Sequence, residues 1–306
     1  MFSVVIPTLN RGPKLLRAVR SVLAQTLMDF EILVIDDGTD DCAALIRQAF
    51  GHDVRYLRGS GKGVAAGRNL GIAEARGDYL AFLDADDWWY PGKLQRVADA
   101  ARAYPEVALF YSKMDAVGAE GNRIRTPPIK EVGRAAYPGI VAGNFIFNST
   151  AVVKRAILER VGGFDTTLCG CEDWELWIRV TRHAPSMLIP EALVAYEHLS
   201  EGSLTSRYET WIRAHDEVIV KTLAADPTLT SRQLDDIHAG LLYTKASIYL
   251  GAGEEELARE HFRQVVSQRW THWRALVYVV VLSWMALRRS LPNRLKVLLR
   301  LPEAHR

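Results

Sequence analysis

The stretch Glu31-Ile32-Leu33-Val34-Ile35-Asp36-Asp37-Gly38 is a short β-branched apolar run that stops at two acids and a glycine. A run of this length and composition predicts a strand that is buried on both faces. Similar apolar runs occupy residues 3–7, 54–57 and 79–83, and segments with helical spacing lie at residues 14–24, 41–50, 64–75 and 91–104. This alternation predicts an α/β fold with a mostly parallel central sheet flanked by helices.

Polar residues follow three of the expected strands. They read Thr8-Leu9-Asn10-Arg11, Asp36-Asp37-Gly38 and Asp84-Ala85-Asp86-Asp87. Because ligands bind at the carboxyl ends of parallel strands, we expect these residues to form one polar, acidic cleft. The glycine pattern of dinucleotide sites does not follow the first strand, and the P-loop pattern does not occur, so both of those nucleotide sites lose their main support.

The segment Asp84-Ala85-Asp86-Asp87 places three carboxylates within four residues at a strand end. Carboxylates this close repel one another unless a cation lies among them. Mg²⁺ and Mn²⁺ prefer oxygen ligands and often share them with phosphate oxygens, so the segment is typical of a metal site for a nucleotide diphosphate. A solvated acidic turn that caps the following helix is the alternative. Asp36-Asp37-Gly38 also has an alternative, because Asp and Gly favour plain turns.

Three further residues are candidates for chemistry. Arg68 lies on an expected helix, where it either binds phosphate or ribose or is an exposed helix arginine. Asp173 lies at the start of another expected helix, where a carboxylate acts either as a general base or as a helix cap. His198 follows a strand-like run and is either a metal or phosphate ligand or an incidental histidine.

Composition limits the class of protein. The chain has 306 residues, 49% of them hydrophobic and 24% charged, which excludes disordered, fibrous and collagen-like proteins. Its net charge of +2 gives no reason to expect nucleic acid as a partner. Three cysteines make no disulfide framework, and Cys169-Gly170-Cys171 lacks the second pair of a zinc site, so we expect a reducing cytosol. No secretory signal pattern follows Met1, which agrees with that expectation.

The rest of the chain divides into an irregular part and a helical part. Turn signals separate short β-like runs over residues 107–150, helices are expected at 151–161 and 172–183, and a strand-like run follows at 192–196. Beyond Ser206 the spacing is helical, with a hairpin over residues 241–266 around Gly251-Ala252-Gly253. We therefore expect an α/β domain over residues 1–205 and a C-terminal helical region over residues 206–306.

The C-terminal part has the most uneven charge of the chain. Residues 269–306 contain eight Lys or Arg residues and one acid. The apolar run at residues 275–287 is shorter than the roughly 20 residues that a membrane-spanning helix needs. Aromatic residues flank or interrupt this run and basic residues follow it, which predicts peripheral attachment to the cytoplasmic face of a membrane. Packing on the α/β domain or in a dimer interface is the alternative.

Taken in order along the chain, these motifs resemble the family 2 inverting glycosyltransferases with the GT-A fold. The resemblance covers about the first 205 residues and includes the strand-end segments quoted above. It also includes Ser21-Val22-Leu23-Ala24-Gln25-Thr26, Arg68-Asn69-Leu70-Gly71-Ile72, Gly162-Gly163-Phe164-Asp165 and Glu172-Asp173-Trp174-Glu175-Leu176-Trp177. Each motif is common by itself, whereas the ordered set is specific.

The resemblance implies a role for each matching residue. It implies that Asp173 is the catalytic base and that Asp84 and Asp86 hold a divalent metal, Mn²⁺ or Mg²⁺. The residues that it implies for the nucleotide-sugar donor are Thr8, Asn10 and Asp37 at the base and ribose, Arg68 and His198 near the ribose and phosphates, and Arg11, Asp84 and Glu172 elsewhere in the matched motifs.

Two departures from the family pattern affect what it implies. Leu9 stands where some relatives have an aromatic residue that stacks on the base. No Gln-x-x-Arg-Trp motif follows Glu172-Asp173, as it would in processive synthases, so transfer of a single sugar is implied. The implied reaction is one inverting displacement, from a nucleotide sugar that is usually uridine-linked to a hydroxyl of a glycan or lipid-linked acceptor in surface polysaccharide synthesis. A non-catalytic nucleotide-sugar-binding or assembly protein is the alternative.

Overall fold

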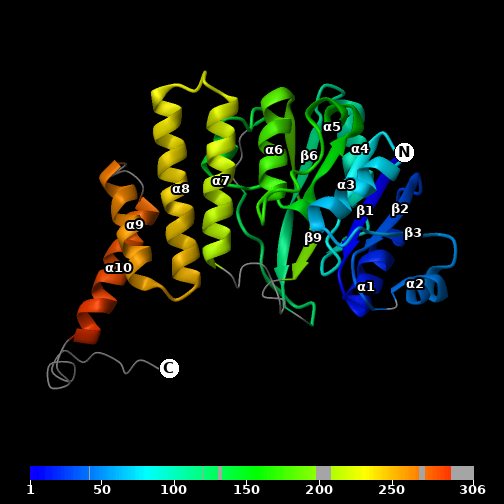
Figure 1. The fold of residues 1–306 in the computed structure, drawn as a ribbon, viewed down its shortest axis with the longest axis horizontal. Helices are drawn as coiled ribbons and strands as arrows, with labels where there is room; N and C mark the ends of the chain where they lie inside the picture. The colour runs from blue at the N-terminus through cyan, green and yellow to red at the C-terminus, as the bar shows by residue number, and fades with distance from the viewer. Residues whose placement is uncertain (41, 119, 130–132, 198–207, 269–272, 291–306) are drawn as a thin grey trace. The chain divides into compact units, whose positions relative to one another are not determined.

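The computed structural model describes residues 1–40, 42–118, 120–129, 133–197, 208–268 and 273–290 (Figure 1). The chain forms two compact units, Met1–Pro227 (unit 1) and Thr228–Arg306 (unit 2). Unit 1 contains a sheet and its flanking helices, and unit 2 is helical in its described part. The boundary expected after residue 205 falls among residues 198–207, which lie outside the described residues.

A mixed sheet of nine strands forms the centre of unit 1. In order across the sheet, the strands are β3 (Arg55–Arg58), β2 (Phe30–Asp36), β1 (Phe2–Thr8), β4 (Tyr79–Phe82), β8 (Val152–Lys154), β6 (Leu109–Val117), β9 (Ser186–Glu197) and β5 (Trp88–Trp89), with β7 (Arg123–Arg125) paired to β6. The first four strands are parallel to one another, whereas β8 is antiparallel to both of its neighbours. The expected α/β fold is confirmed, and β1, β2 and β4, which precede the polar segments, belong to its parallel part.

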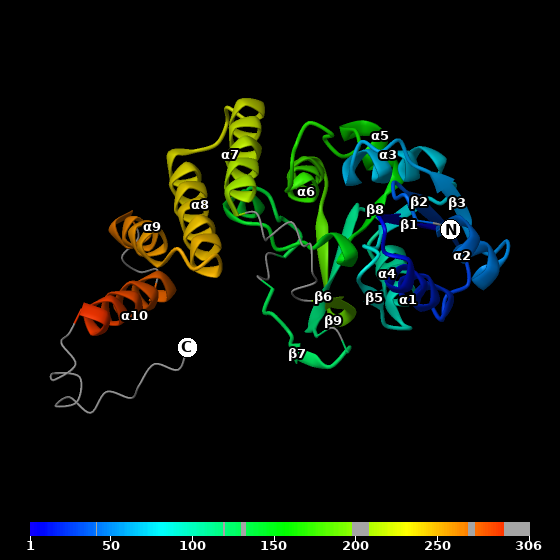
Figure 2. The same cartoon turned by 60° about the horizontal axis from the view of Figure 1, so that its bottom comes forward.

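Helices cover both faces of the sheet (Figure 2). One face carries α1 (Gly12–Leu23), α2 (Cys42–Phe50) and α4 (Lys93–Ala103), and the other carries α3 (Val64–Glu74), α5 (Arg155–Val161) and α6 (Glu172–His183). The remaining elements of unit 1 are α7 (Tyr208–Ala225) and two 3₁₀ turns, Gly139–Ala142 and Asn148–Thr150. All seven residues of β1 are buried, as its uninterrupted apolar run predicts.

Close packing of α3 on β1 depends on a glycine. A Cβ atom at Gly71 would lie 2.3 Å from Cγ1 of Val5, far inside van der Waals contact. A larger residue would therefore push α3 away from the sheet. Because Arg68 lies about one turn earlier on the same helix, this packing also sets how deeply the Arg68 side chain lies in the protein.

One expected helix begins later than the sequence predicts. The spacing predicts a helix over residues 151–161, but the structure has strand β8 first and a helix only from Arg155. Val152 and Val153 are fully buried and pair with both β4 and β6. β-branched side chains fit such a pleated, enclosed position, so pairing across the sheet overrides the local helical spacing.

Unit 2 contains α8 (Ser231–Gly251), α9 (Glu255–Gln268) and α10 (Trp273–Ser290) in its described part. A capping box between Thr230 and Gln233 starts α8. The expected hairpin around residues 251–253 is confirmed by α8 and α9. The buried core takes side chains from all three helices: Leu242, Ala246, Ala258, Phe262, Val265, Ala275 and Leu282. Within the described part of the chain, no helix combines the length and the apolar character needed to cross a bilayer.

Candidate active site

The carboxyl ends of β1, β2 and β4 meet at one edge of the sheet. Thr8, the last residue of β1, pairs in register with Asp36, the last residue of β2. The backbone N–H of Asp37 donates to the carbonyl of Thr8 at 3.0 Å, and the Asp84–Asp87 loop follows β4, the other neighbour of β1. The three polar segments are therefore brought together, as parallel pairing predicts. Of the residues expected at the site, His198 lies outside the described residues.

Arg68 joins two motifs that are far apart in the sequence. Its Nη2 donates to Asp84 Oδ1 at 2.7 Å, and its Nη1 donates to Glu172 Oε1 at 2.6 Å. The side chain is buried, and its Nε has no hydrogen-bond partner among the described residues. Burial acts to lower the pKa of the guanidinium, but the two carboxylates outweigh it and raise the pKa above its ordinary value. Arg68 therefore stays charged and holds the Asp84–Asp87 loop beside the first turn of α6.

Asp84 and Asp86 supply the oxygen atoms that a divalent metal would need. Asp84 Oδ1 accepts from Arg68 and from Asn148 Nδ2 at 3.0 Å, and Asp86 Oδ2 accepts from Arg11 Nη1 at 2.7 Å. Both carboxylates are partly exposed, with side-chain exposures of 32% and 22%. Two accessible carboxylates at one strand end are ligands of the kind that Mg²⁺ and Mn²⁺ prefer, so this pair fits such an ion.

Asp87 is the buried member of the same loop. Its carboxylate accepts from Ser149 Oγ at 2.5 Å and from the backbone N–H of Glu197 at 3.1 Å. Burial, together with the charges of the two other loop aspartates, raises the pKa of Asp87 well above its ordinary value. Glu197 is itself held by Lys14 and Arg17 of α1, each at 2.5 Å. This network connects the Asp84–Asp87 loop to the end of β9. It was not predicted from the sequence, because its members are far apart along the chain.

A second group of side chains with metal-binding potential lies at the end of β2. Ligand atoms of Asp36, Asp40 and Cys42 lie within 4.8 Å of one another. The Asp36 carboxylate, however, accepts from the backbone N–H of Gly38 at 2.7 Å, from the Tyr56 hydroxyl at 2.7 Å and from an arginine of β3. Because these donors satisfy the carboxylate without an ion, we assign this group a structural role.

Asn10 and Asp37 organise the loops that follow β1 and β2. Asn10 has a φ of 54°, a left-handed conformation that Asn tolerates, and its Oδ1 accepts from the backbone N–H of Thr39 at 2.7 Å. Asp37 Oδ1 accepts from the backbone N–H of Gly61 at 2.9 Å. The hydroxyl of Thr8 is buried and has no hydrogen-bond partner in the described part of the chain. A bound polar ligand would satisfy that hydroxyl, since buried polar groups are nearly always paired.

Asp173 lies in the first turn of α6, next to Glu172. Its Oδ1 accepts from the backbone N–H of Trp174 at 2.7 Å, and its Oδ2 lies 3.5 Å from Asn144 Nδ2. Burial and, second, the charge of Glu172 raise the pKa of Asp173 to about 7, against the opposing effect of Arg68. A carboxyl group that titrates near neutral pH suits proton transfer under physiological conditions.

The residue before this helix, Cys171, has a strained backbone. Its φ of 58° lies in the left-handed region, which is costly for a residue with a Cβ atom. Its Sγ lies 3.4 Å from Nδ1 of His215 on α7, and the ring centre of His215 lies 5.0 Å from that of Trp174. No sequence signal pointed to His215, because its partner is 44 residues away. Strain next to Asp173 indicates that the surrounding structure fixes where α6 begins.

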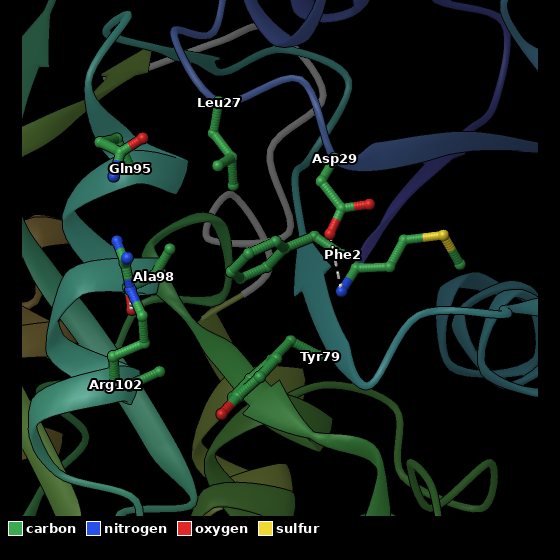
Figure 3. A pocket seen from close by; sticks show the side chains of 9 residues that line it. Phe2, Leu27, Asp29, Tyr79, Gln95, Ala98 and Arg102 are labelled. Atoms are coloured by element: carbon green, nitrogen blue, oxygen red, sulfur yellow. Dashed lines mark hydrogen bonds and ion pairs between the residues drawn. The ribbon is translucent and has the colours of Figure 1, made fainter.

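A pocket of about 470 Å³ lies at the amino ends of β1 and β4, away from the strand ends described above (Figure 3). Its walls include Phe2 of β1, Tyr79 of β4 and Arg102 of α4. None of the residues expected at the active site lines it. The pocket is therefore separate from the candidate site.

A comparison with known families identifies the chain. The model of the family described as "Glycosyl transferase family 2" matches residues 3–162, which include β1 and the Asp84–Asp87 loop. The chain belongs to glycosyl transferase family 2. This match confirms the family resemblance drawn from the sequence.

Curated relatives match this family 2 protein over about two thirds of its length. It is 32% identical over 213 residues to the O-antigen biosynthesis protein RfbC of Myxococcus xanthus, and 26% identical over 213 residues to an uncharacterized glycosyltransferase of Rickettsia conorii. These alignments cover 67% and 66% of this chain but only 16% and 35% of the two relatives. An uncharacterized glycosyltransferase of Nostoc is 28% identical over 240 residues, which is 71% of this chain and 72% of that protein.

Solved structures share the fold of the family 2 protein. TarS of S. aureus gives a TM-score of 0.61 at 18% identity, over 88% of this chain and 49% of TarS. A TarS fragment in complex with UDP-GlcNAc gives 0.58 at 15% identity, over 92% and 88% of the two chains. A mannosyltransferase of Pyrobaculum calidifontis, in complex with GDP-Man and Mn²⁺, gives 0.61 at 18% identity, over 94% and 80%. The protein therefore has the GT-A fold.

Proposed function

We propose that this family 2 protein is a metal-dependent, inverting glycosyltransferase of the hexosyltransferase type that moves one sugar from a nucleotide sugar to an acceptor hydroxyl. The observation that carries the proposal is the Arg68 bridge, which holds Asp84 of the strand-end loop and Glu172 of α6 on one guanidinium. Through this bridge, the residues proposed for the donor and for the base lie at the same edge of the sheet. A carboxyl group whose pKa is raised to about 7 beside that edge also supports catalysis.

The donor is proposed to bind across the ends of β1 and β2. Thr8, Asn10 and Asp37 are the candidates for the base and ribose, and the buried hydroxyl of Thr8 has no partner among the described residues. Arg11, Arg68, Glu172 and His198 complete the proposed donor site. The two solved relatives described above bind UDP-GlcNAc and GDP-Man, which supports a nucleotide-sugar donor. We propose a uridine-linked sugar.

Asp84 and Asp86 are proposed to hold Mn²⁺ or Mg²⁺. The Mn²⁺ in the mannosyltransferase complex supports this choice. When bound, the ion neutralises the charge that develops on the leaving diphosphate. Arg68 and Arg11 contribute positive charge at the same place, since each donates to one of the two carboxylates.

Asp173 is proposed to act as the general base. It would remove the proton from the acceptor hydroxyl while that oxygen attacks the anomeric carbon from the side opposite the diphosphate, which inverts the configuration. Glu172, whose carboxylate is paired with Arg68, keeps the first turn of α6 in place. A positioned base contributes about 10²–10⁴ in rate.

The acceptor is proposed to be a glycan or a lipid-linked sugar in surface polysaccharide synthesis. The matched relative of Myxococcus xanthus is an O-antigen biosynthesis protein, which supports this setting. We place the enzyme in the cytoplasm, at the inner face of the cytoplasmic membrane, with residues 1–205 as the glycosyltransferase domain and residues 206–306 as its helical region.

The test begins with the donor. Nucleotide sugars are screened by thermal shift with Mn²⁺, since a bound donor raises the unfolding temperature by mass action. The donor that binds is then incubated with candidate acceptors, and release of nucleoside diphosphate and the anomeric configuration of the product are measured. Donor binding without release in the presence of any acceptor would favour a non-catalytic binding protein. Retained configuration would overturn the inverting mechanism.

A further inference from the structure

α10 packs on the rest of unit 2 with one face only. Ala275 and Leu282 are buried in the unit 2 core, and Tyr278 stacks on Phe262 of α9 with ring centres 4.7 Å apart. Residues separated by seven positions lie on the same side of a helix, so the packed face is the one that contains Ala275 and Leu282. The opposite side of the helix has no role in that core.

The opposite side of α10 is aliphatic and exposed. It contains Leu276, Val277, Val280 and Val281, whose exposed fractions are 44%, 49%, 59% and 45%. Spacings of one, four and five residues place these side chains on one face. No charged residue occurs from Ala275 to Ser283. A helix that is apolar all round is normally buried, so this face requires an apolar partner.

Unit 1 offers no comparable apolar face among its described residues. Its exposed large apolar side chains are spread over separate segments, and only Val220 and Leu223, both on α7, share an element. Single exposed apolar residues are normal on soluble proteins and need no partner. The α10 face therefore finds no evident apolar counterpart elsewhere in the described chain.

The sequence around and after this face carries the charge that an anionic surface attracts. Residues 269–306 contain eight Lys or Arg residues and one acid, whereas the remaining chain contains 30 basic and 35 acidic residues. Two copies that met through α10 would bring two strongly basic segments together. An aliphatic helix face next to a basic segment is instead the combination that binds the interface of an anionic bilayer.

We infer that the α10 face formed by Leu276, Val277, Val280 and Val281 docks on an anionic lipid bilayer. α10 lies in the plane of the interface with this face toward the acyl chains, and the basic charge of residues 269–306 attracts the protein to anionic headgroups. The inference deepens the proposed function, because it brings the enzyme to the surface where a lipid-linked acceptor is held. The inference assigns the membrane contact to one side of α10, whereas the other side packs in the unit 2 core.

The test measures binding of the full-length protein to vesicles of phosphatidylglycerol and phosphatidylcholine, and to vesicles of phosphatidylcholine alone. We expect binding to the first kind only, and weaker binding at high salt, because salt screens the basic residues. The double variant Val277→Asp, Val281→Asp should bind at least about tenfold more weakly, since it places two charges on the docking face. The matched control is Val220→Asp, an exposed valine of α7 that should leave binding unchanged.

Several results would overturn the inference. One is wild-type protein that ignores both kinds of vesicle, and another is a double variant that binds as the wild type does. A wild-type dimer that the double variant loses, seen by light scattering without lipid, would assign the face to a second copy. If the double variant unfolds at a lower temperature than the wild type and the Val220→Asp control does not, the α10 face packs within the chain. Donor binding and transfer to a soluble acceptor are measured on the same samples, so failure of docking is distinguishable from failure of the proposed function.

Discussion

Replacing Asp173 with Asn separates the two roles that this residue could have. The amide is nearly the same size as the carboxyl group, and its oxygen can still accept from the backbone N–H of Trp174, which lies 2.7 Å from Asp173 Oδ1. What the substitution removes is the basic carboxylate. The expected loss in transfer rate is about 10²–10⁴, which corresponds to about 3–5 kcal/mol of activation free energy.

The same substitution should leave the protein at least as stable at pH 8. The pKa of Asp173 is raised from 3.8 to about 7 by folding, so the folded protein keeps a proton that the unfolded chain loses between about pH 4 and pH 7. The free energy of unfolding therefore falls as the pH rises through this window, and the full cost is present above pH 7. Asn does not ionise, so the variant avoids a cost of up to about 4 kcal/mol.

The assay pairs initial rates of nucleoside diphosphate release with urea unfolding at pH 5 and pH 8. A base predicts a slow enzyme of unchanged or higher stability, with donor affinity close to that of the wild type. A helix cap alone predicts normal transfer, because the Asn oxygen keeps the hydrogen bond from the backbone N–H of Trp174. Asp165→Asn is the matched control, because Lys221 and Thr167 outweigh burial and lower the pKa of Asp165 to about 2. It should lose stability above pH 4 and keep its rate. Transfer by Asp173→Asn within about threefold of the wild type would refute the assignment of the base.

Three further variants test the site. Asp86→Ala should abolish the part of donor affinity that depends on Mn²⁺ and leave the metal-free affinity unchanged, measured by calorimetry; equal affinities with metal would contradict the proposed ligand. Arg68→Met should lower the free energy of unfolding by about 3–5 kcal/mol, because it leaves two carboxylates without their shared cation; a urea-measured loss below about 1 kcal/mol would show that the bridge contributes little. Cys171→Gly should change stability by less than about 1 kcal/mol, because relief of the left-handed strain offsets the lost thiol, whereas Cys171→Val should be clearly destabilising. Equal losses for the two would argue against strain at that position.

The parallel half of the sheet was predictable because its strands are local features. Each apolar run, such as residues 31–35, is long enough to predict a buried strand. The polar residues that follow the run mark where the strand ends. The carboxyl ends of such strands fall at one edge by topology, so the meeting of Thr8, Asp36 and the Asp84–Asp87 loop followed without any knowledge of side-chain contacts.

The connections within the site were not predictable in the same way. An arginine on a helix between two glycines suggests an exposed side chain, but Arg68 is buried on partners 16 and 104 residues away. Strand β8 was not predicted because it has only three residues and a helix follows it directly. A pattern of three residues is too short to be told apart from the helical spacing of that helix. Contacts of this kind depend on the assembled fold, and the sequence near each residue carries no trace of them.

The antiparallel strand β8 links the middle of the sheet to the loop that follows β4. β6 and β8 are hydrogen-bonded neighbours, with Leu109 opposite Val153 and Phe110 opposite Val152. Asn148 and Ser149, just before β8, reach the Asp84–Asp87 loop, where their side chains hydrogen-bond to Asp84 and Asp87. A change in the segment before β8 would therefore reach the Asp84–Asp87 loop, because Asn148 and Ser149 connect the two.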